Sequence, residues 1–194
     1  MESAYTVGVR NILVVEDEII VAEDIRRRLT EMGFAVSGVV CTGEDAIREV
    51  SRTVPDLVLM DIFLRGKMDG IEAAEILGKR FHVPVVFLSA SADPNTLERA
   101  KHADSFGYLL KPFDEREMES TIEMALSKHA MERRLQESEV RFRLLYEDAP
   151  LPYQSLGEDA RLLDVNKSWL DALGYSRKEV IGHPFGAMPR KRNA

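Results

Sequence analysis

The sequence predicts an α/β fold in which a parallel sheet is covered by helices on both faces. Up to about Lys128, short apolar runs rich in β-branched residues alternate with longer segments whose apolar residues follow a helical spacing. Hydrophobic residues make up 45% of the 194-residue chain and charged residues 30%, which is typical of a globular protein with a buried core. These observations indicate repeated βα units and therefore a doubly wound sheet.

Five short apolar runs are the predicted strands, and helices are expected between them. The strands are expected at 11–15, 35–40, 56–60, 83–89 and 107–110. The first four helices are expected at 19–32, 43–50, 70–77 and 94–102. Gly33 follows the first helix as a left-handed stop, and Asp114 can cap the start of a fifth helix.

The predicted fifth helix has no stop signal, because neither Gly nor Pro occurs from 115 to 147. Seven of its positions follow alternating spacings of four and three, which is the pattern of a coiled-coil seam. The seam consists of Met124, Lys128, Met131, Leu135, Ser138, Phe142 and Leu145. Burial of its apolar members against a second copy predicts a homodimer through helix 114–147, which polar Lys128 and Ser138 would weaken.

The sequence pattern changes where Pro150 and Pro152 end this helix. Residues 153–165 indicate two strands joined by a turn around Gly157, and short helices are expected at 166–173 and 177–181. The predicted organisation is a first domain at 1–128, a helical coiled-coil linker at 129–148 and a smaller segment at 149–194.

Charge and hydropathy argue against several classes of partner. The formal net charge of −7 would repel a phosphate backbone, and the only compact basic run is Arg190, Lys191 and Arg192, so nucleic-acid binding is not expected. No apolar run approaches the roughly 20 residues that span a bilayer, and the N-terminus lacks the layout of a signal peptide. We therefore expect a cytoplasmic protein without membrane association. The single Cys41 is expected to be a small buried hydrophobic residue.

Polar and charged side chains follow four of the five predicted strands. In chain order they are Glu16, Asp17, Glu18, Asp61, Ser89 and Lys111. Singly, each could be a helix-start acid, a turn residue or a surface amine. Ligands of parallel sheets bind outside the carboxyl ends of the strands, so together these residues favour a functional site. Carboxylates crowded in one crevice require a cation, and ligands that offer only oxygen favour Mg²⁺.

Four segments resemble the receiver domains of two-component response regulators, namely VVEDE, DLVLMDI, PVVFLSA and GYLLKPF. The resemblance covers about 10–129 and implies a flavodoxin-like sheet with strand order 2-1-3-4-5. It implies that a histidine kinase or phosphotransfer protein phosphorylates Asp61 in a Mg²⁺-dependent reaction that forms an aspartyl phosphate. Such a domain is a phosphoacceptor, which can promote its own phosphorylation and dephosphorylation, and not a conventional enzyme.

The same resemblance implies a role for each residue. The implied Mg²⁺ ligands are Glu16, Asp17, Asp61 and the backbone carbonyl of Phe63. Lys111 would pair with phosphoryl oxygens, and Ser89 would donate a hydrogen bond to one of them. Tyr108 would act with Ser89 as the switch that responds to phosphate. The Lys111–Pro112 bond occupies the family's cis position.

Two other functions remain as alternatives. A phosphohydrolase of similar topology would place a second Asp two residues after the nucleophile Asp61, where this chain has Phe63. An interaction scaffold that is no longer phosphorylated is the other alternative, and the presence of Asp61, Lys111 and the acidic pair argues against it.

The segments ESEVRFRLLYEDAP and LLDVNKSWLDALGYSRKEVIGHPF resemble the opening half of a PAS sensory domain. Asn166 before a short helix fits this resemblance, but the long later strands of a PAS sheet do not follow. The resemblance implies output through the long helix to PAS-type or kinase machinery, in a piece of a hybrid sensor kinase or in a naturally shortened regulator. A helical tail with an irregular end is the alternative.

Overall fold

The computed structural model describes residues 9–90, 98–99 and 105–187. The chain divides into two compact units, Met1–Met131 and Glu132–Ala194. The helix expected at 94–102 lies outside the described residues except for Glu98 and Arg99, which are helical. The basic run at 190–192 also lies outside them.

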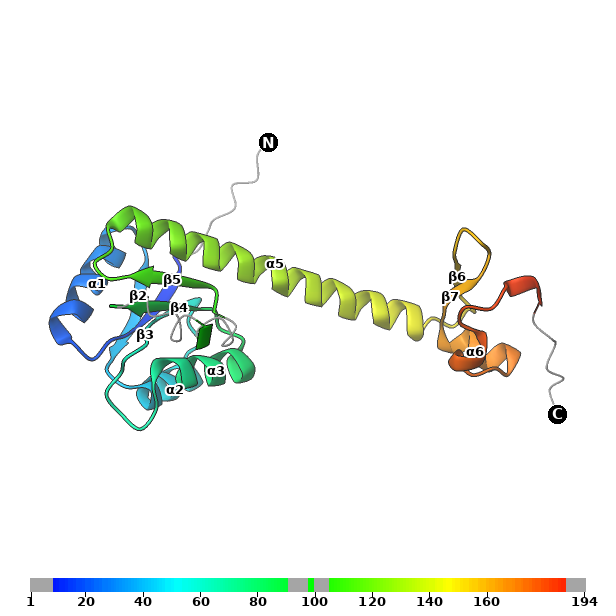
Figure 1. The fold of residues 1–194 in the computed structure, drawn as a ribbon, viewed down its shortest axis with the longest axis horizontal. Helices are drawn as coiled ribbons and strands as arrows, with labels where there is room; N and C mark the ends of the chain where they lie inside the picture. Colours follow the sequence, from blue (N-terminus) through cyan, green and yellow to red (C-terminus); the bar gives the residue numbers. More distant parts are fainter. Residues whose placement is uncertain (1–8, 91–97, 100–104, 188–194) are drawn as a thin grey trace. The chain divides into compact units, whose positions relative to one another are not determined.

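A parallel sheet of five strands forms the centre of the first unit, in the order β2-β1-β3-β4-β5 (Figure 1). The strands are β1 (Asn11–Val15), β2 (Ala35–Val40), β3 (Leu57–Asp61), β4 (Val85–Ser89) and β5 (Gly107–Leu110). The expected parallel sheet and its strand order are thus confirmed.

Two strands differ from the predicted ranges. β3 begins and ends one residue later than expected, so that Asp61 is the last residue of the strand and not the residue after it. β4 begins at Val85 instead of residue 83. Pro84 has no N–H to give to the ladder, although its carbonyl accepts a hydrogen bond from Val58 N at 3.0 Å.

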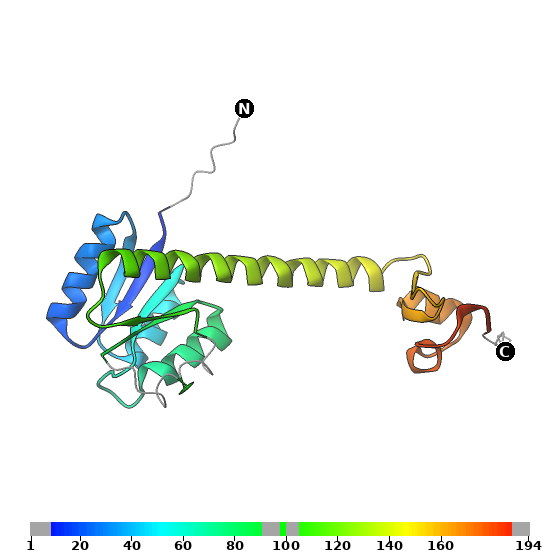
Figure 2. The same ribbon diagram turned by 45° about the horizontal axis from the view of Figure 1, so that its top comes forward.

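Helices cover both faces of the sheet, as Figure 1 and Figure 2 show. They are α1 (Ile19–Glu31), α2 (Gly43–Arg52), α3 (Gly70–Phe81) and α5 (Glu115–Glu147). Leu13 and Met60 belong to the apolar layer under α2 and α3, whereas Val14 and Leu59 belong to the layer under α1 and α5. Neighbouring residues of one strand therefore face opposite layers, as the strand period of two requires.

Side chains fix the starts of three helices. Thr42, Asp69 and Asp114 begin α2, α3 and α5, and each accepts a hydrogen bond from the backbone N–H three residues later. α1 ends before Gly33, whose φ of 88° confirms the expected left-handed stop. α3 continues past its predicted end at residue 77 to Phe81, and His82 ends it in a left-handed conformation with a φ of 54°.

α5 continues for 33 residues, as the lack of a stop signal predicts. In the first unit it packs on the sheet through Met118, Ile122 and Ala125. The large apolar seam residues are exposed by 64% at Met124, 70% at Met131, 62% at Leu135, 66% at Phe142 and 70% at Leu145. The ammonium of Lys128 lies 5.0 Å from the centre of the Phe106 ring, so this polar seam position packs against the residue just before β5.

The second unit contains a small antiparallel sheet and short helices, as expected. The elements are β6 (Gln154–Leu156), β7 (Leu162–Val165), α6 (Lys167–Leu173), α7 (Arg177–Val180) and the 3₁₀ helix η1 (Phe185–Ala187). Their core consists of Leu162, Val165, Trp169 and Val180. Asn166 is fully buried and accepts hydrogen bonds from the backbone N–H groups of Tyr153 and Trp169, which joins the hairpin to α6.

The expectation that Cys41 is buried was wrong. Cys41 is exposed because it follows the last residue of β2, which is an edge strand of the sheet. In the described part of the chain, every helix is too short or too polar to span a bilayer.

Candidate functional site

Three carboxylates meet at the carboxyl edge of the sheet. Glu16 and Asp17 follow β1, and Asp61 ends the neighbouring strand β3, which pairs with β1 through Val15 and Met60. One oxygen from each carboxylate lies within 4.8 Å of the other two. Glu16 and Asp61 are buried and Asp17 is half-buried. Three of the predicted site residues therefore form one cluster that can hold a cation.

Lys111 reaches this cluster from the end of β5. Its Nζ lies 2.6 Å from Glu16 Oε2 and 2.5 Å from Asp61 Oδ2. Its backbone N–H donates to the carbonyl of Ser89 at 2.8 Å, and the Lys111–Pro112 peptide bond is cis, as expected. The ammonium thus bridges two carboxylates that come from different strands.

Burial and charge change the pKa values of the bridged groups. Burial raises the pKa of Glu16, and the negative charge of Asp61 adds to this effect, while the hydrogen bond from Lys111 opposes it. Burial acts to lower the pKa of Lys111, but its hydrogen bonds with Asp61 and Glu16 outweigh burial, so this pKa is raised. Lys111 therefore remains a cation at neutral pH, which suits it to pairing with an anion.

The backbone next to Asp61 is packed closely. The Asp61 Oδ1 atom accepts a hydrogen bond from the backbone N–H of Phe63 at 2.8 Å, and the Phe63 side chain is exposed. At Gly70, the first residue of α3, a Cβ would lie 1.9 Å from the carbonyl oxygen of Asp61. Only glycine allows α3 to start this close to β3, so the helix start fixes the backbone of Asp61.

Ser89 and Tyr108 lie on the two strands beyond β3. Ser89 is fully buried at the end of β4, one residue after Leu88, which pairs with Asp61. Tyr108 pairs with Phe87 across β4 and β5, is half-buried, and packs against the layer under α2 and α3. The structure thus places both predicted switch residues on neighbouring strands, with Ser89 at the edge where the carboxylates meet.

Sequence reasoning missed two residues of this region, Gly70 and Arg65. Gly70 had a usable signal, since a glycine directly after the capping residue Asp69 suggests a close backbone approach. Arg65 had no such signal. Its Nε lies 2.8 Å from Asp17 Oδ2, so the loop after β3 brings a second cation to the carboxylate cluster.

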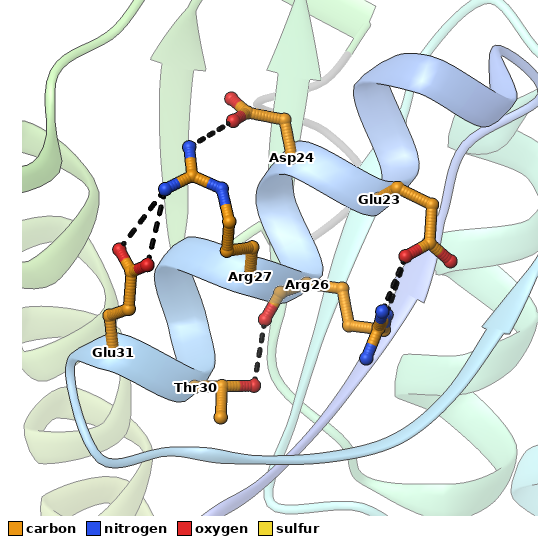
Figure 3. A pocket seen from close by; sticks show the side chains of 6 residues that line it. All are labelled: Glu23, Asp24, Arg26, Arg27, Thr30 and Glu31. Carbon is orange, nitrogen blue, oxygen red and sulfur yellow. Dashed lines mark hydrogen bonds and ion pairs between the residues drawn. The ribbon is translucent and has the colours of Figure 1, made fainter.

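A separate surface hollow lies on the outer face of α1 (Figure 3). It is lined by Glu23, Asp24, Arg26, Arg27, Thr30 and Glu31. Its arginines pair with carboxylates of the same helix, with Arg26 and Arg27 each 2.6 Å from an acidic partner. The strand-end residues do not line this hollow, so we do not assign it to the site.

Comparison with known proteins is consistent with this geometry. The response regulator receiver domain matches residues 12–123. The chain is 34% identical over 119 residues to the transcriptional regulatory protein PdtaR of Mycobacterium tuberculosis, a match that covers 61% of this chain and 58% of PdtaR. It is 32% identical over 133 residues to the regulatory protein AtoC of Escherichia coli, covering 66% of this chain and 28% of AtoC. The chain therefore spans less than two thirds of the length of these curated relatives.

Two solved structures show the same fold at higher identity. The signal receiver domain of a modulated diguanylate cyclase from Desulfovibrio desulfuricans is 38% identical, with a TM-score of 0.61, and covers 64% of this chain and 98% of its own. The N-terminal domain of a response regulator/sensory box/GGDEF 3-domain protein from Carboxydothermus hydrogenoformans is 36% identical, with a TM-score of 0.56, and covers 68% of this chain and 99% of its own. The chain belongs to the family of response regulator receiver domains, which are regulatory phosphoacceptor domains.

Proposed function

We propose that this chain is a signalling receiver that a histidine kinase or phosphotransfer protein phosphorylates on Asp61 in a Mg²⁺-dependent reaction. The observation that carries the proposal is the meeting of Glu16, Asp17 and Asp61 at one sheet edge, with Lys111 bridging two of them. A buried carboxylate beside a fixed cation is suited to accept a phosphoryl group, because the cation can pair with the phosphoryl oxygens.

The residues present fit Mg²⁺. Three clustered carboxylates offer only oxygen, which is the ligand type that hard divalent cations prefer. We infer that Glu16, Asp17, Asp61 and the backbone carbonyl of Phe63 hold the metal. When bound, Mg²⁺ supplies positive charge to the phosphoryl oxygens during transfer.

In the proposed phosphoryl transfer, Asp61 is the nucleophile. A carboxylate oxygen of Asp61 attacks the phosphorus of the donor's phosphohistidine, a new O–P bond forms, and the N–P bond breaks with its electron pair returning to the imidazole. Lys111, which neutralises Asp61 before transfer, then pairs with a phosphoryl oxygen. Ser89 donates its hydroxyl to another phosphoryl oxygen, and Tyr108 changes position together with it as the switch.

The start of α1 supports docking of a protein phosphodonor beside Asp61. Ile19 and Ile20 directly follow the acidic residues of the site and are exposed by 73% and 87%. Exposed branched apolar side chains at such a position offer contact area that water would otherwise cover. The donor would thus contact an apolar surface that directly follows the acidic residues Glu16 and Asp17.

Intact-mass measurement tests the proposed phosphorylation. Incubation with Mg²⁺ and acetyl phosphate should add one phosphoryl group to the wild-type chain and none to Asp61→Asn. Asp24→Asn, which changes an exposed carboxylate of α1, should be phosphorylated like wild type. Failure to label the wild type, or persistent labelling of Asp61→Asn, would remove the proposal.

We further propose that the signal passes through α5 to the second unit, which resembles the opening part of a PAS domain. The hairpin, the buried Asn166 and the short helices support this reading. The Carboxydothermus protein offers a precedent, since it is a response regulator/sensory box/GGDEF 3-domain protein. A hybrid sensor kinase or a naturally shortened regulator would both use such a connection, and the exposed seam of α5 would pair two copies in a weak homodimer.

A further inference from the structure

We propose that Arg65 is a built-in competitor of the metal: its guanidinium neutralises Asp17 until Mg²⁺ displaces it. The inference rests on the proposed function, because it assumes that Asp17 is a metal ligand. Its basis is the ion pair between Arg65 Nε and Asp17 Oδ2 at 2.8 Å, within a cluster whose ligand oxygens suit a divalent cation.

The two cations of the site are held very differently. The side chain of Lys111 is 19% exposed and touches Glu16 and Asp61, so it is fixed between two buried carboxylates. The side chain of Arg65 is 85% exposed, whereas that of its partner Asp17 is only 11% exposed. Arg65 can therefore swing into water at little cost, while Lys111 stays at the site.

The charges in the cluster show why a displaceable cation is useful. Three carboxylates crowd within 4.8 Å of one another, and without cations they would repel one another strongly. Lys111 pairs with Glu16 and Asp61, and Arg65 pairs with Asp17, so two cations face three carboxylates. A metal bound to Asp17 takes over the role of Arg65, so the two cations exclude each other at this carboxylate and Arg65 must lower the apparent Mg²⁺ affinity.

The loop that carries Arg65 is anchored independently of the ion pair. The backbone N–H of Lys67 donates to Glu44 Oε1 of α2 at 3.2 Å. At Gly66, which has a φ of 155°, a Cβ would lie 3.1 Å from Glu44 Oε2. Because Glu44 holds the loop, the backbone of Arg65 stays near Asp17 after its side chain leaves, and the competition is reversible.

Titration of the unphosphorylated full chain with MgCl₂, followed by calorimetry, tests the competition. Arg65→Gln should bind Mg²⁺ roughly 2- to 5-fold more tightly than wild type, which is the affinity equivalent of a good exposed ion pair. Lys67→Gln removes the same charge from the same loop but leaves the contact between Arg65 and Asp17 in place. Its gain in Mg²⁺ affinity should therefore be less than about half of the gain in Arg65→Gln. In an Asp17→Asn background, Arg65→Gln should have no effect.

Three results would overturn the inference: an Arg65→Gln affinity equal to or weaker than wild type, an equal gain in Lys67→Gln, or an undiminished gain when Asp17 is Asn. These outcomes differ from failure of the proposed function, which would appear as absence of Mg²⁺ binding by the wild-type chain. Because Arg65 is largely exposed, its replacement should leave the far-ultraviolet circular dichroism unchanged, which checks that folding is intact.

Discussion

Glu16 is a buried carboxylate whose charge is paired with the ammonium of Lys111. It is fully buried, and a buried carboxylate without a cation is expensive because water no longer solvates its charge. Lys111 supplies that cation at 2.6 Å and simultaneously holds Asp61. The same ammonium thus stabilises the fold and, under the proposed function, would pair with the phosphoryl group, which would link stability to the chemistry of the site.

Replacement of Lys111 by Met should show how much its ammonium contributes to the stability of the fold. The variant keeps an unbranched stem but leaves Glu16 buried without its cation, so the free energy of unfolding should fall by about 2 to 4 kcal/mol without Mg²⁺. Saturating Mg²⁺ should restore part of this loss, since a ligand that binds only the folded state stabilises it. Urea unfolding with and without Mg²⁺ measures both effects.

Lys79→Met is the matched control for this prediction. Lys79 forms an exposed pair with Glu75 within α3, so its loss should change stability by less than about 0.5 kcal/mol. Equal stability of Lys111→Met and wild type in the absence of Mg²⁺ would show that Glu16 does not depend on this cation.

At the scale of the element, the start of α3 connects β3, the strand that ends at Asp61, to the rest of the fold. Gly70 lies against the backbone of Asp61, and Asp69 caps the helix just before it. Asp69 also pairs with Arg99 at 2.6 Å. A single carboxylate therefore satisfies a helix start and an ion pair immediately next to the site.

The contribution of Asp69 should depend on pH. Burial acts to raise its pKa, but hydrogen bonds from Arg99 and from the backbone of Glu72 outweigh burial and hold the pKa below its usual value. A lowered folded-state pKa means stability that is fully present above the unfolded pKa of about 3.9 and is lost as the pH falls through the folded pKa. Asp69→Ala should cost about 1 kcal/mol at pH 7, the usual loss of a helix cap.

Urea unfolding of wild type and Asp69→Ala at pH 7 and pH 3 checks the prediction, and the difference between them should shrink at the lower pH. Asp69→Asn keeps an oxygen that can cap the helix, so it should lose less than Asp69→Ala at pH 7. A difference that stays constant between the two pH values would contradict the assigned role of the charge.

Elements with strong local signals could be predicted from the sequence, and contacts made by loops could not. α5 was predictable because neither Gly nor Pro interrupts it, and β5 matched its expected range. The start of β4 was misplaced because Pro84 cannot donate to the ladder. The end of α3 was misplaced because the left-handed C-cap is His82 and not a glycine, so the sequence carries no clear stop signal there.

In the candidate site, too, the residues placed by the sheet could be predicted and the contact made by a loop could not. The clustering of Glu16, Asp17, Asp61 and Lys111 follows from parallel topology, which brings the carboxyl ends of neighbouring strands to one edge. The contact of Arg65 with Asp17 depends on the path of a loop anchored by Glu44, and no periodicity or motif encodes that path. Cys41 was misjudged because burial was inferred from residue type without regard to its place after β2.

At the scale of the whole molecule, α5 is the element that belongs to both units. Its first turns are buried in the core of the first unit. Its last residue, Glu147, belongs to the second unit and pairs there with Arg177 at 2.6 Å. Arg177 also contacts Asp164 of β7 at 2.9 Å. Because each end of α5 is held by contacts within its own unit, we propose that the signal passes through this helix.

We predict that α5 pairs two copies of the chain through the seam and that phosphorylation changes this pairing. Full burial of a large apolar side chain contributes roughly 1.5 to 3 kcal/mol, so five exposed seam residues offer much more than surface ion pairs could. The polar positions Lys128 and Ser138 reduce this gain, and Lys128 already contacts Phe106, so we expect a weak dimer centred beyond Met131. Sedimentation velocity with and without Mg²⁺ and acetyl phosphate measures the pairing.

Leu135→Glu should make the chain monomeric, because it would bury one carboxylate from each copy within the seam. Gln136→Glu introduces the same charge one residue later, outside the seam, and should dimerise like wild type. Phosphorylation should shift the dimer fraction of wild type and Gln136→Glu alike. A wild-type chain that stays monomeric under every condition, or a dimer unaffected by the charge at Leu135, would rule out this interface.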